Sequence, residues 1–170
     1  MLTATFMITT ALAAAPPLLA KENALPRNMT PAEQRWVQDH PIAAPRGMTS
    51  PPSGPIHCAA EYEPMDAILL AWEGSNSWKN ILATMAANIT TIGNADVVIS
   101  IESSSEQTSA LSSVVSAGAD SSRVRFVNRT TDSIWIRDYG PRYIFEGDCR
   151  AIVDHTYNRP RPHDNAFNAY

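Results

Sequence analysis

AILLAW (residues 67–72) and ADVVISI (residues 95–101) are two short, almost continuously apolar stretches, and they decide the fold class of this chain. Apolar runs of this length are typical of strands that are covered on both faces of a sheet. Between them, residues 78–91 carry apolar side chains at helical spacing, and Gly93-Asn94 ends that pattern. The order predicts a strand, a helix and a second strand in one α/β unit.

The same alternation continues toward the C-terminus. Residues 103–117 predict a second helix, with Ser104 or Ser105 as its cap and Gly118 as its stop. The apolar residues of 124–127 then predict a third strand. Strands that alternate with helices favour an α/β layer structure with a partly parallel sheet.

Two flanking regions lack this alternation of apolar strands and helices. Residues 142–145 and 150–154 predict two further strands, joined by a hairpin turn at residues 146–148. Residues 21–60 contain many of the chain's 13 prolines and predict an extended lead-in, because proline disfavours long helices and central strands. Within it, residues 30–39 predict a short helix that Thr30 caps.

The N-terminal residues 1–20 carry no charge and end in several small side chains, which is the pattern of a cleaved export signal. An uncleaved anchor is the alternative. The apolar stretch is shorter than the ~20 residues of a membrane span, however, and Pro16-Pro17 interrupt it. We therefore expect a secreted or periplasmic protein without a stable membrane anchor. A net charge of −4 gives no reason to expect a nucleic-acid partner.

Two cysteines, Cys58 and Cys149, fit one disulfide in an exported protein, or two unpaired buried thiols. Pairing needs Cα atoms within roughly 7 Å of each other, which the sequence does not settle. Neither cysteine has the spacing of a metal site, so we expect no metal and no other cofactor.

WIRDYGP (residues 135–141) is the stretch that carries the most chemistry. It follows the third predicted strand, and ligands of open α/β sheets bind beyond the carboxyl ends of strands. An aromatic ring beside a carboxylate suits a planar guanidinium, since Trp135 offers stacking and Asp138 accepts the N–H fork. The alternative is a structural loop held by an Arg137–Asp138 pair, with Trp135 in the core.

Residues 134–141 closely resemble the signature of the bacterial-type peptidylarginine deiminase and agmatine deiminase family, and residues 60–72 are similar to that family's opening strand. The resemblance implies a pentein fold, a five-bladed α/β propeller around a substrate channel. Residues 61–170 would be the N-terminal part of that catalytic domain.

The resemblance also implies a mechanism and site roles. A cysteine thiolate attacks the guanidinium carbon, ammonia leaves, and water hydrolyses the covalent intermediate to a ureido product. Asp138 would hold the guanidinium and Trp135 would border the channel, while Arg137 and Tyr139 would support the loop. The family's nucleophilic cysteine, its histidine and its second aspartate match no residue of this chain, so we expect no activity from the chain as given.

RPRPHD (residues 159–164) is the second candidate constellation. In the peptidylarginine branch, an arginine pair at about this position binds the carboxylate of a C-terminal arginine, which gives Arg159 and Arg161 a substrate-binding role by resemblance. The alternative is a solvated basic loop stiffened by proline.

Three functions remain open at this point. The first is citrullination of an arginine-containing peptide by a secreted peptidylarginine deiminase. The second is agmatine deiminase, which makes N-carbamoylputrescine from this small guanidinium substrate on the route to putrescine. The third is a non-catalytic guanidinium-binding or structural remnant. The oligomeric state stays open.

Overall fold

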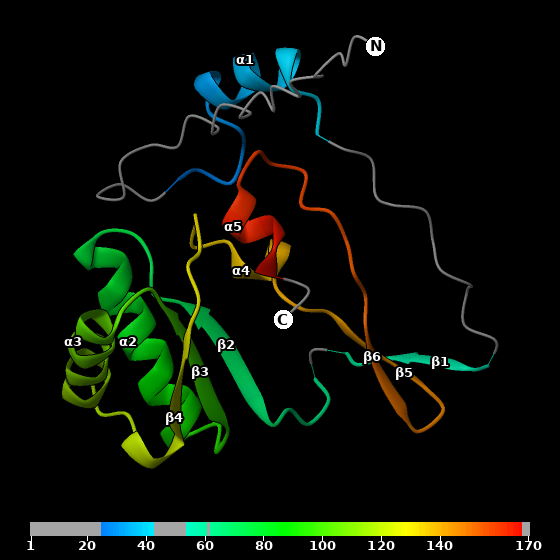
Figure 1. Cartoon of the computed structure of the whole chain (residues 1–170). Coiled ribbons are helices and arrows are strands. Elements are labelled where there is room, and N and C mark those ends of the chain that lie inside the picture. Colours follow the sequence, from blue (N-terminus) through cyan, green and yellow to red (C-terminus); the bar gives the residue numbers. More distant parts are fainter. Residues whose placement is uncertain (1–24, 43–53, 61, 168–170) are drawn as a thin grey trace, which may run out of the picture.

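The computed structural model describes residues 25–42, 54–60 and 62–167. Within these ranges the strands form two three-stranded sheets, one parallel and one antiparallel (Figure 1). The export signal expected at residues 1–20 lies outside the described residues. None of the described helices is long and apolar enough to cross a membrane.

The parallel sheet confirms the predicted α/β unit. It contains β2 (Ala67–Ala71), β3 (Asp96–Ile101) and β4 (Val124–Asn128) in the order β2-β3-β4. Both strand pairs are parallel, with Leu69 opposite Val98. The observed bounds lie within one residue of those that the apolar runs predict.

Two helices cover one face of this sheet, α2 (Asn76–Thr91) and α3 (Ser104–Ser116), as Figure 1 shows. The core between helices and sheet includes Leu70 and Trp72, and its fully buried members are small or β-branched: Ala86, Val97, Ile99, Ala110 and Val114. Burying each Val or Ile side chain stabilises the fold by ~1.5–3 kcal/mol.

The ends of α3 differ slightly from the expectation. Ser103, rather than Ser104 or Ser105, is the N-cap, because its hydroxyl accepts the backbone N–H of Glu106 at 3.2 Å. Gly118 ends the helix as predicted, with a φ of 100° that a side chain would strain.

The antiparallel sheet contains β1 (Ile56–Cys58), β5 (Tyr143–Glu146) and β6 (Cys149–Ile152) in the order β1-β5-β6. The hairpin of β5 and β6 confirms the prediction, whereas β1 lies inside the expected extended lead-in. Cys58 is opposite Ile144, and Cys149 is opposite Glu146.

The disulfide that the sequence suggested is not formed. Cys58 and Cys149 are both free and exposed. They lie on β1 and β6, and β5 separates these strands. Neighbouring strands are ~4.8 Å apart, so two spacings exceed the reach of a disulfide. The alternative of two buried thiols is also wrong, since both residues are exposed.

Short helices complete the chain. α1 (Pro31–Asp39) has the predicted Thr30 cap, extended to a full capping box by Glu33. α4 (Ile136–Tyr139) and α5 (Pro162–Asn165) are single turns, and a 3₁₀ turn spans Ser121–Arg123. The sequence did not predict these three short elements, because one helical turn is too brief for a periodic pattern.

The second face of β2 packs against the segment that contains α4 and α5. Leu69 points away from the α2 and α3 side and contacts a second cluster built from Tyr139, Tyr157 and Phe167. β2 is therefore covered on both faces, as its continuous apolar run predicted. This second cluster brings the α4 and α5 segments together next to the sheet.

Candidate functional site

The turn that carries Asp138 is fixed by buried contacts on both sides. Tyr139 is fully buried, and its hydroxyl donates to the backbone carbonyl of Ser133 at 2.5 Å. Burial raises the pKa of Tyr139 well above its ordinary range, so the phenol stays protonated. Gly140 must be glycine, because a Cβ would lie 2.5 Å from the carbonyl oxygen of Ile136. Tyr139 therefore shapes the turn, as its expected supporting role requires.

A buried carboxylate ties the preceding loop to α5. Asp164 accepts the backbone N–H of Asp132 at 2.7 Å and the hydroxyl of Ser133 at 2.7 Å. Burial raises the pKa of Asp164 to about 6, although these hydrogen bonds oppose the rise. Sequence reasoning missed this residue, since the only signal was an acid at the end of the RPRPHD stretch.

Asp138 and Arg159 lie in one open pocket of about 600 Å³. The pocket brings together residues from three separate parts of the chain: Arg27, Asn28, Asp138, Arg142, His155, Thr156, Tyr157, Asn158 and Arg159. The polypeptide therefore places the predicted guanidinium-binding carboxylate beside one arginine of the predicted pair.

A guanidinium already lies on Asp138 in this pocket. The Arg27 Nε is 3.1 Å from Asp138 Oδ2, and its Nη2 is 3.5 Å from Oδ1. This is the two-point approach that a guanidinium makes to a carboxylate. The Arg27 side chain is 68% exposed and that of Asp138 is 27% exposed, so the pair itself adds only ~0–1 kcal/mol of stability.

The backbone of Asp138 has its own neighbours. Its carbonyl oxygen lies 3.3 Å from Nε2 of His155 and accepts an N–H of Arg142 at 3.4 Å. Sequence reasoning did not place Arg27, Arg142 or His155 in this site. Arg27 is distant in sequence and His155 follows the hairpin. Arg142 comes directly after the WIRDYGP stretch, but it lies outside the motif.

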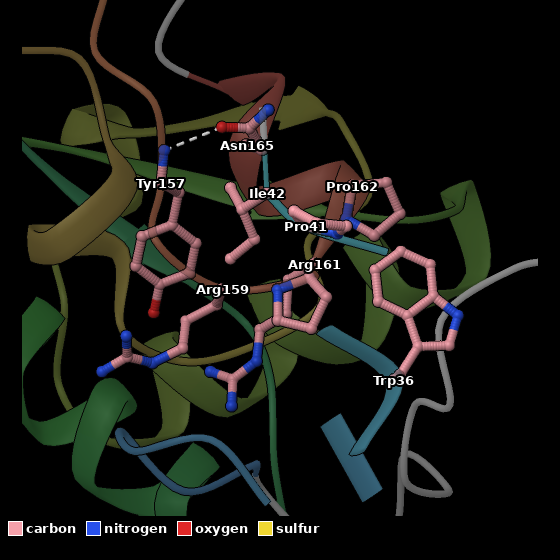
Figure 2. A pocket seen from close by; sticks show the side chains of 9 residues that line it. Trp36, Pro41, Ile42, Tyr157, Arg159, Arg161, Pro162 and Asn165 are labelled. Carbon is pink, nitrogen blue, oxygen red and sulfur yellow. Dashed lines mark hydrogen bonds between the residues drawn. The ribbon is translucent and has the colours of Figure 1, made fainter. Parts of the chain in front are cut away.

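The two arginines of the RPRP stretch have different environments (Figure 2). Arg159 lines the open pocket, and its Nε donates to the backbone carbonyl of Arg27 at 3.0 Å. Arg161 is fully buried and pairs with Glu33 at 2.9 Å. Its Nη2 donates to the carbonyl of Pro26 at 2.8 Å. The alternative of a solvated basic loop is therefore wrong for Arg161.

Glu33 is ionised in this pair. Burial alone would raise its pKa, but hydrogen bonds from Arg161 and Thr30 lower it below the ordinary value of 4.5. Arg161 Nε therefore has a permanent anionic partner inside the protein. A direct role for Arg161 in binding a substrate carboxylate remains a prediction that this pairing does not favour.

Trp135 and Arg137 lie outside the lining of the 600 Å³ pocket. The Trp135 indole N–H donates to the backbone carbonyl of Leu25 at 2.7 Å. Its ring meets Trp78 edge to face, with centroids 6.5 Å apart. Arg137 is exposed on α4. The structure therefore does not place the Trp135 ring beside the carboxylate of Asp138 within this pocket.

A smaller, mostly apolar hollow of about 230 Å³ lies on the other side of Arg159 and Arg161, and Figure 2 shows it. Trp36 and Ile42 contribute its apolar wall, and Tyr157 borders both hollows. The Tyr157 hydroxyl and Arg161 Nη1 are buried without a hydrogen-bond partner among the described residues. Burial raises the pKa of Tyr157, so this hydroxyl remains a neutral donor.

The described residues supply neither a metal cluster nor a thiol at this site. No group of three or more His, Cys, Asp or Glu side chains among them is arranged to hold a metal ion. Cys58 and Cys149 do not line the pocket. The pocket lining provides one carboxylate and the N–H donors of its arginines, groups that can pair with a guanidinium and with a carbonyl oxygen.

Comparison with known proteins identifies the family of this chain. The model of the Porphyromonas-type peptidyl-arginine deiminase family matches residues 57–167. An agmatine deiminase from Ectopseudomonas mendocina (strain ymp) is 30% identical over 118 residues, which cover 65% of this chain and 30% of that protein. The solved structure of a C. jejuni agmatine deiminase superposes with a TM-score of 0.51 at 20% identity, over 67% of this chain and 36% of the other. The chain thus spans about a third of both proteins.

Proposed function

The chain belongs to the Porphyromonas-type peptidyl-arginine deiminase family, and on that premise we propose that it forms the guanidinium-binding part of an enzyme that hydrolyses peptidylarginine to peptidylcitrulline and ammonia. The α/β unit of β2, β3 and β4 would be one blade of a pentein propeller. The likeness to a solved agmatine deiminase supports this placement of the fold.

One observation carries the proposal: a guanidinium rests on Asp138 through two N–H groups, in a pocket that opens to solvent. A carboxylate in this position fixes the planar group and opposes loss of its proton, which keeps the guanidinium carbon electrophilic. A thiolate then forms a bond to that carbon, ammonia leaves with a proton, and water cleaves the carbon–sulfur bond. Neither Cys58 nor Cys149 lines the pocket, so we propose that neither of them is the nucleophile.

Arg159 favours a substrate that carries a carbonyl or carboxylate group. Its Nε donates to a backbone carbonyl in the same pocket that holds Asp138. Arginine in a peptide offers both a guanidinium and a carbonyl, whereas agmatine has a guanidinium and an ammonium group but no carbonyl. This pairing of donor and acceptor supports peptidylarginine over agmatine.

Agmatine deiminase is the second candidate, because both relatives described above carry that name. Production of N-carbamoylputrescine for putrescine biosynthesis would then be the role of the whole protein. A non-catalytic guanidinium-binding protein is the third candidate, and the absence of a thiol from the described pocket lining is the observation that favours it.

Substitution of Arg159 by Ala separates the first two candidates. We expect binding of Nα-acetylarginine to weaken by roughly ten- to a hundredfold, since a charge-assisted hydrogen bond contributes ~1.5–3 kcal/mol. Binding of agmatine should hardly change. Isothermal titration calorimetry with both ligands measures the difference, and Arg35→Ala on the exposed part of α1 is the matched control. Equal losses for the two ligands would show that Arg159 has a structural role and would remove its support for the peptidylarginine assignment.

A further inference from the structure

The four residues Leu25–Asn28 lie across the site and contact it in the way a bound peptide would. Their contacts run to all four side chains that the sequence singled out for direct binding. The Trp135 indole N–H donates to the Leu25 carbonyl, Arg161 Nη2 to the Pro26 carbonyl, Arg159 Nε to the Arg27 carbonyl, and the Arg27 guanidinium donates to Asp138. In Figure 2 the guanidinium groups of Arg159 and Arg161 both point toward the blue ribbon of this segment.

We propose that Leu25–Asn28 is an intramolecular ligand that holds the guanidinium site closed against arginine-containing peptides. The proposal rests on the proposed function, because it takes Asp138 as the guanidinium site. It adds a statement about regulation: the site of the full chain is occupied by the chain's own Arg27, and external ligands must displace it.

The pattern of contacts distinguishes a ligand from ordinary packing. Three of the four contacts go to backbone carbonyls, which every peptide presents, at 2.7, 2.8 and 3.0 Å. One side chain of the segment is recognised through its charge, that of Arg27. The site binds the backbone through three carbonyl oxygens and binds one side chain through the carboxylate of Asp138. It therefore selects an arginine within a peptide.

The contacts differ in strength in the way that a displaceable ligand requires. The neighbouring helix α1 is anchored by the fully buried Glu33–Arg161 pair. The Arg27 guanidinium is 68% exposed, and its ion-pair partner within the described residues is the partly exposed Asp138. The segment therefore stays near the pocket while its arginine is weakly held. A tethered group of this kind competes at high effective concentration although its own bond is weak.

The expected effect follows from the fraction of chains whose pocket is open. An exposed ion pair shifts such an equilibrium by a factor of about two to five. The apparent affinity of an external ligand falls by the same factor, because only the open form binds it. Removing the Arg27 side chain should restore that affinity, because it frees Asp138 and leaves the other lining residues unchanged.

The test compares full-length chains for binding of Nα-acetylarginine amide by calorimetry. We expect Arg27→Ala to bind about two- to fivefold more tightly than the unchanged chain, and Arg27→Lys to lie between them because lysine keeps the charge but loses the fork. Arg35→Ala removes an equal charge from the same part of the chain outside the pocket, and it should match the unchanged chain. The peptide acetyl-Leu-Pro-Arg-Asn-amide should compete with the probe, and its Arg→Ala analogue should not.

Each other outcome decides against the inference. If Arg27→Ala binds no more tightly than the unchanged chain while Asp138→Asn abolishes binding, the proposed function stands and the intramolecular ligand is refuted. If no variant binds the probe, or if Asp138→Asn binds it as well as the unchanged chain, the guanidinium site itself is refuted, and the inference fails with it. Circular dichroism of each variant confirms that the fold is retained.

Discussion

Replacing Arg161 by Met should destabilise the docking of α1 severely. Arg161 and Glu33 are both fully buried, and their Nε and Oε1 atoms are 2.9 Å apart. Loss of the arginine leaves an ionised carboxylate without its partner, which costs ~3–5 kcal/mol. In a chain of this size such a loss lowers the melting temperature by roughly 10 °C, if α1 unfolds together with the rest.

A double-mutant cycle tests the origin of that loss. Glu33→Leu combined with Arg161→Met replaces both charges by apolar groups, so the double variant should be more stable than Arg161→Met alone. Urea unfolding gives the free energies, and amide hydrogen exchange of residues 31–39 shows whether α1 opens separately. The energetic role of the buried pair would be refuted if Arg161→Met lowered the free energy of unfolding by less than ~1 kcal/mol. It would also be refuted if the double variant were no more stable than Arg161→Met alone.

The same pair predicts a pH dependence with a definite sign. Burial would raise the pKa of Glu33, but Arg161 and Thr30 lower it below 4.5 in the folded protein. A carboxyl group whose pKa is lowered by folding contributes stability above its unfolded pKa, and that contribution disappears as the pH falls through the folded value. The protection of α1 amides should therefore decrease below about pH 4.5.

Three further predictions concern other parts of the chain. Burial raises the pKa of Asp164 from 3.8 to about 6, so its contribution to stability is lost as the pH rises from about 4 to above 6. Chemical unfolding between pH 4 and 7 should therefore show the unchanged chain losing up to about 3 kcal/mol relative to Asp164→Asn. Cys58 and Cys149 are exposed and free, so a thiol reagent should modify both in the native protein, and a protected pair would contradict the strand order. We also propose that export removes the first ~13 to 20 residues, and a mature protein that retains Met1 in mass spectrometry would exclude this.

The parallel sheet and its helices could be read from the sequence because their residues are buried in regular patterns. Strands β2 and β3 are nearly continuous apolar runs, and α2 and α3 repeat apolar residues at helical spacing. β1 could not be predicted, since it is three exposed residues next to prolines and exists only through its pairing with β5. Long-range pairing of this kind leaves no local pattern in the sequence.

The site was predicted in part for similar reasons. Asp138 and Arg159 belong to recognisable local motifs, and the structure brings them into one pocket. Arg27 and Glu33 carry no such signal, because their partners Asp138 and Arg161 lie more than a hundred residues away along the chain. The solvated basic loop that was one reading of Arg161 is wrong, because the burial of this side chain depends on the docking of α1.

Binding of a guanidinium by Asp138 is the central claim, and calorimetry on Asp138→Asn tests it most directly. The amide keeps the shape of the side chain but removes the charge and turns one acceptor into a donor. Measured in the Arg27→Ala background, Nα-acetylarginine amide should bind at least tenfold more weakly to Asp138→Asn, since a hydrogen-bonded charge contributes ~1.5–3 kcal/mol. Asp148→Asn, in the exposed β5–β6 turn, is the matched control and should bind normally. Equal affinities for Asp138→Asn and Asp148→Asn would contradict the account.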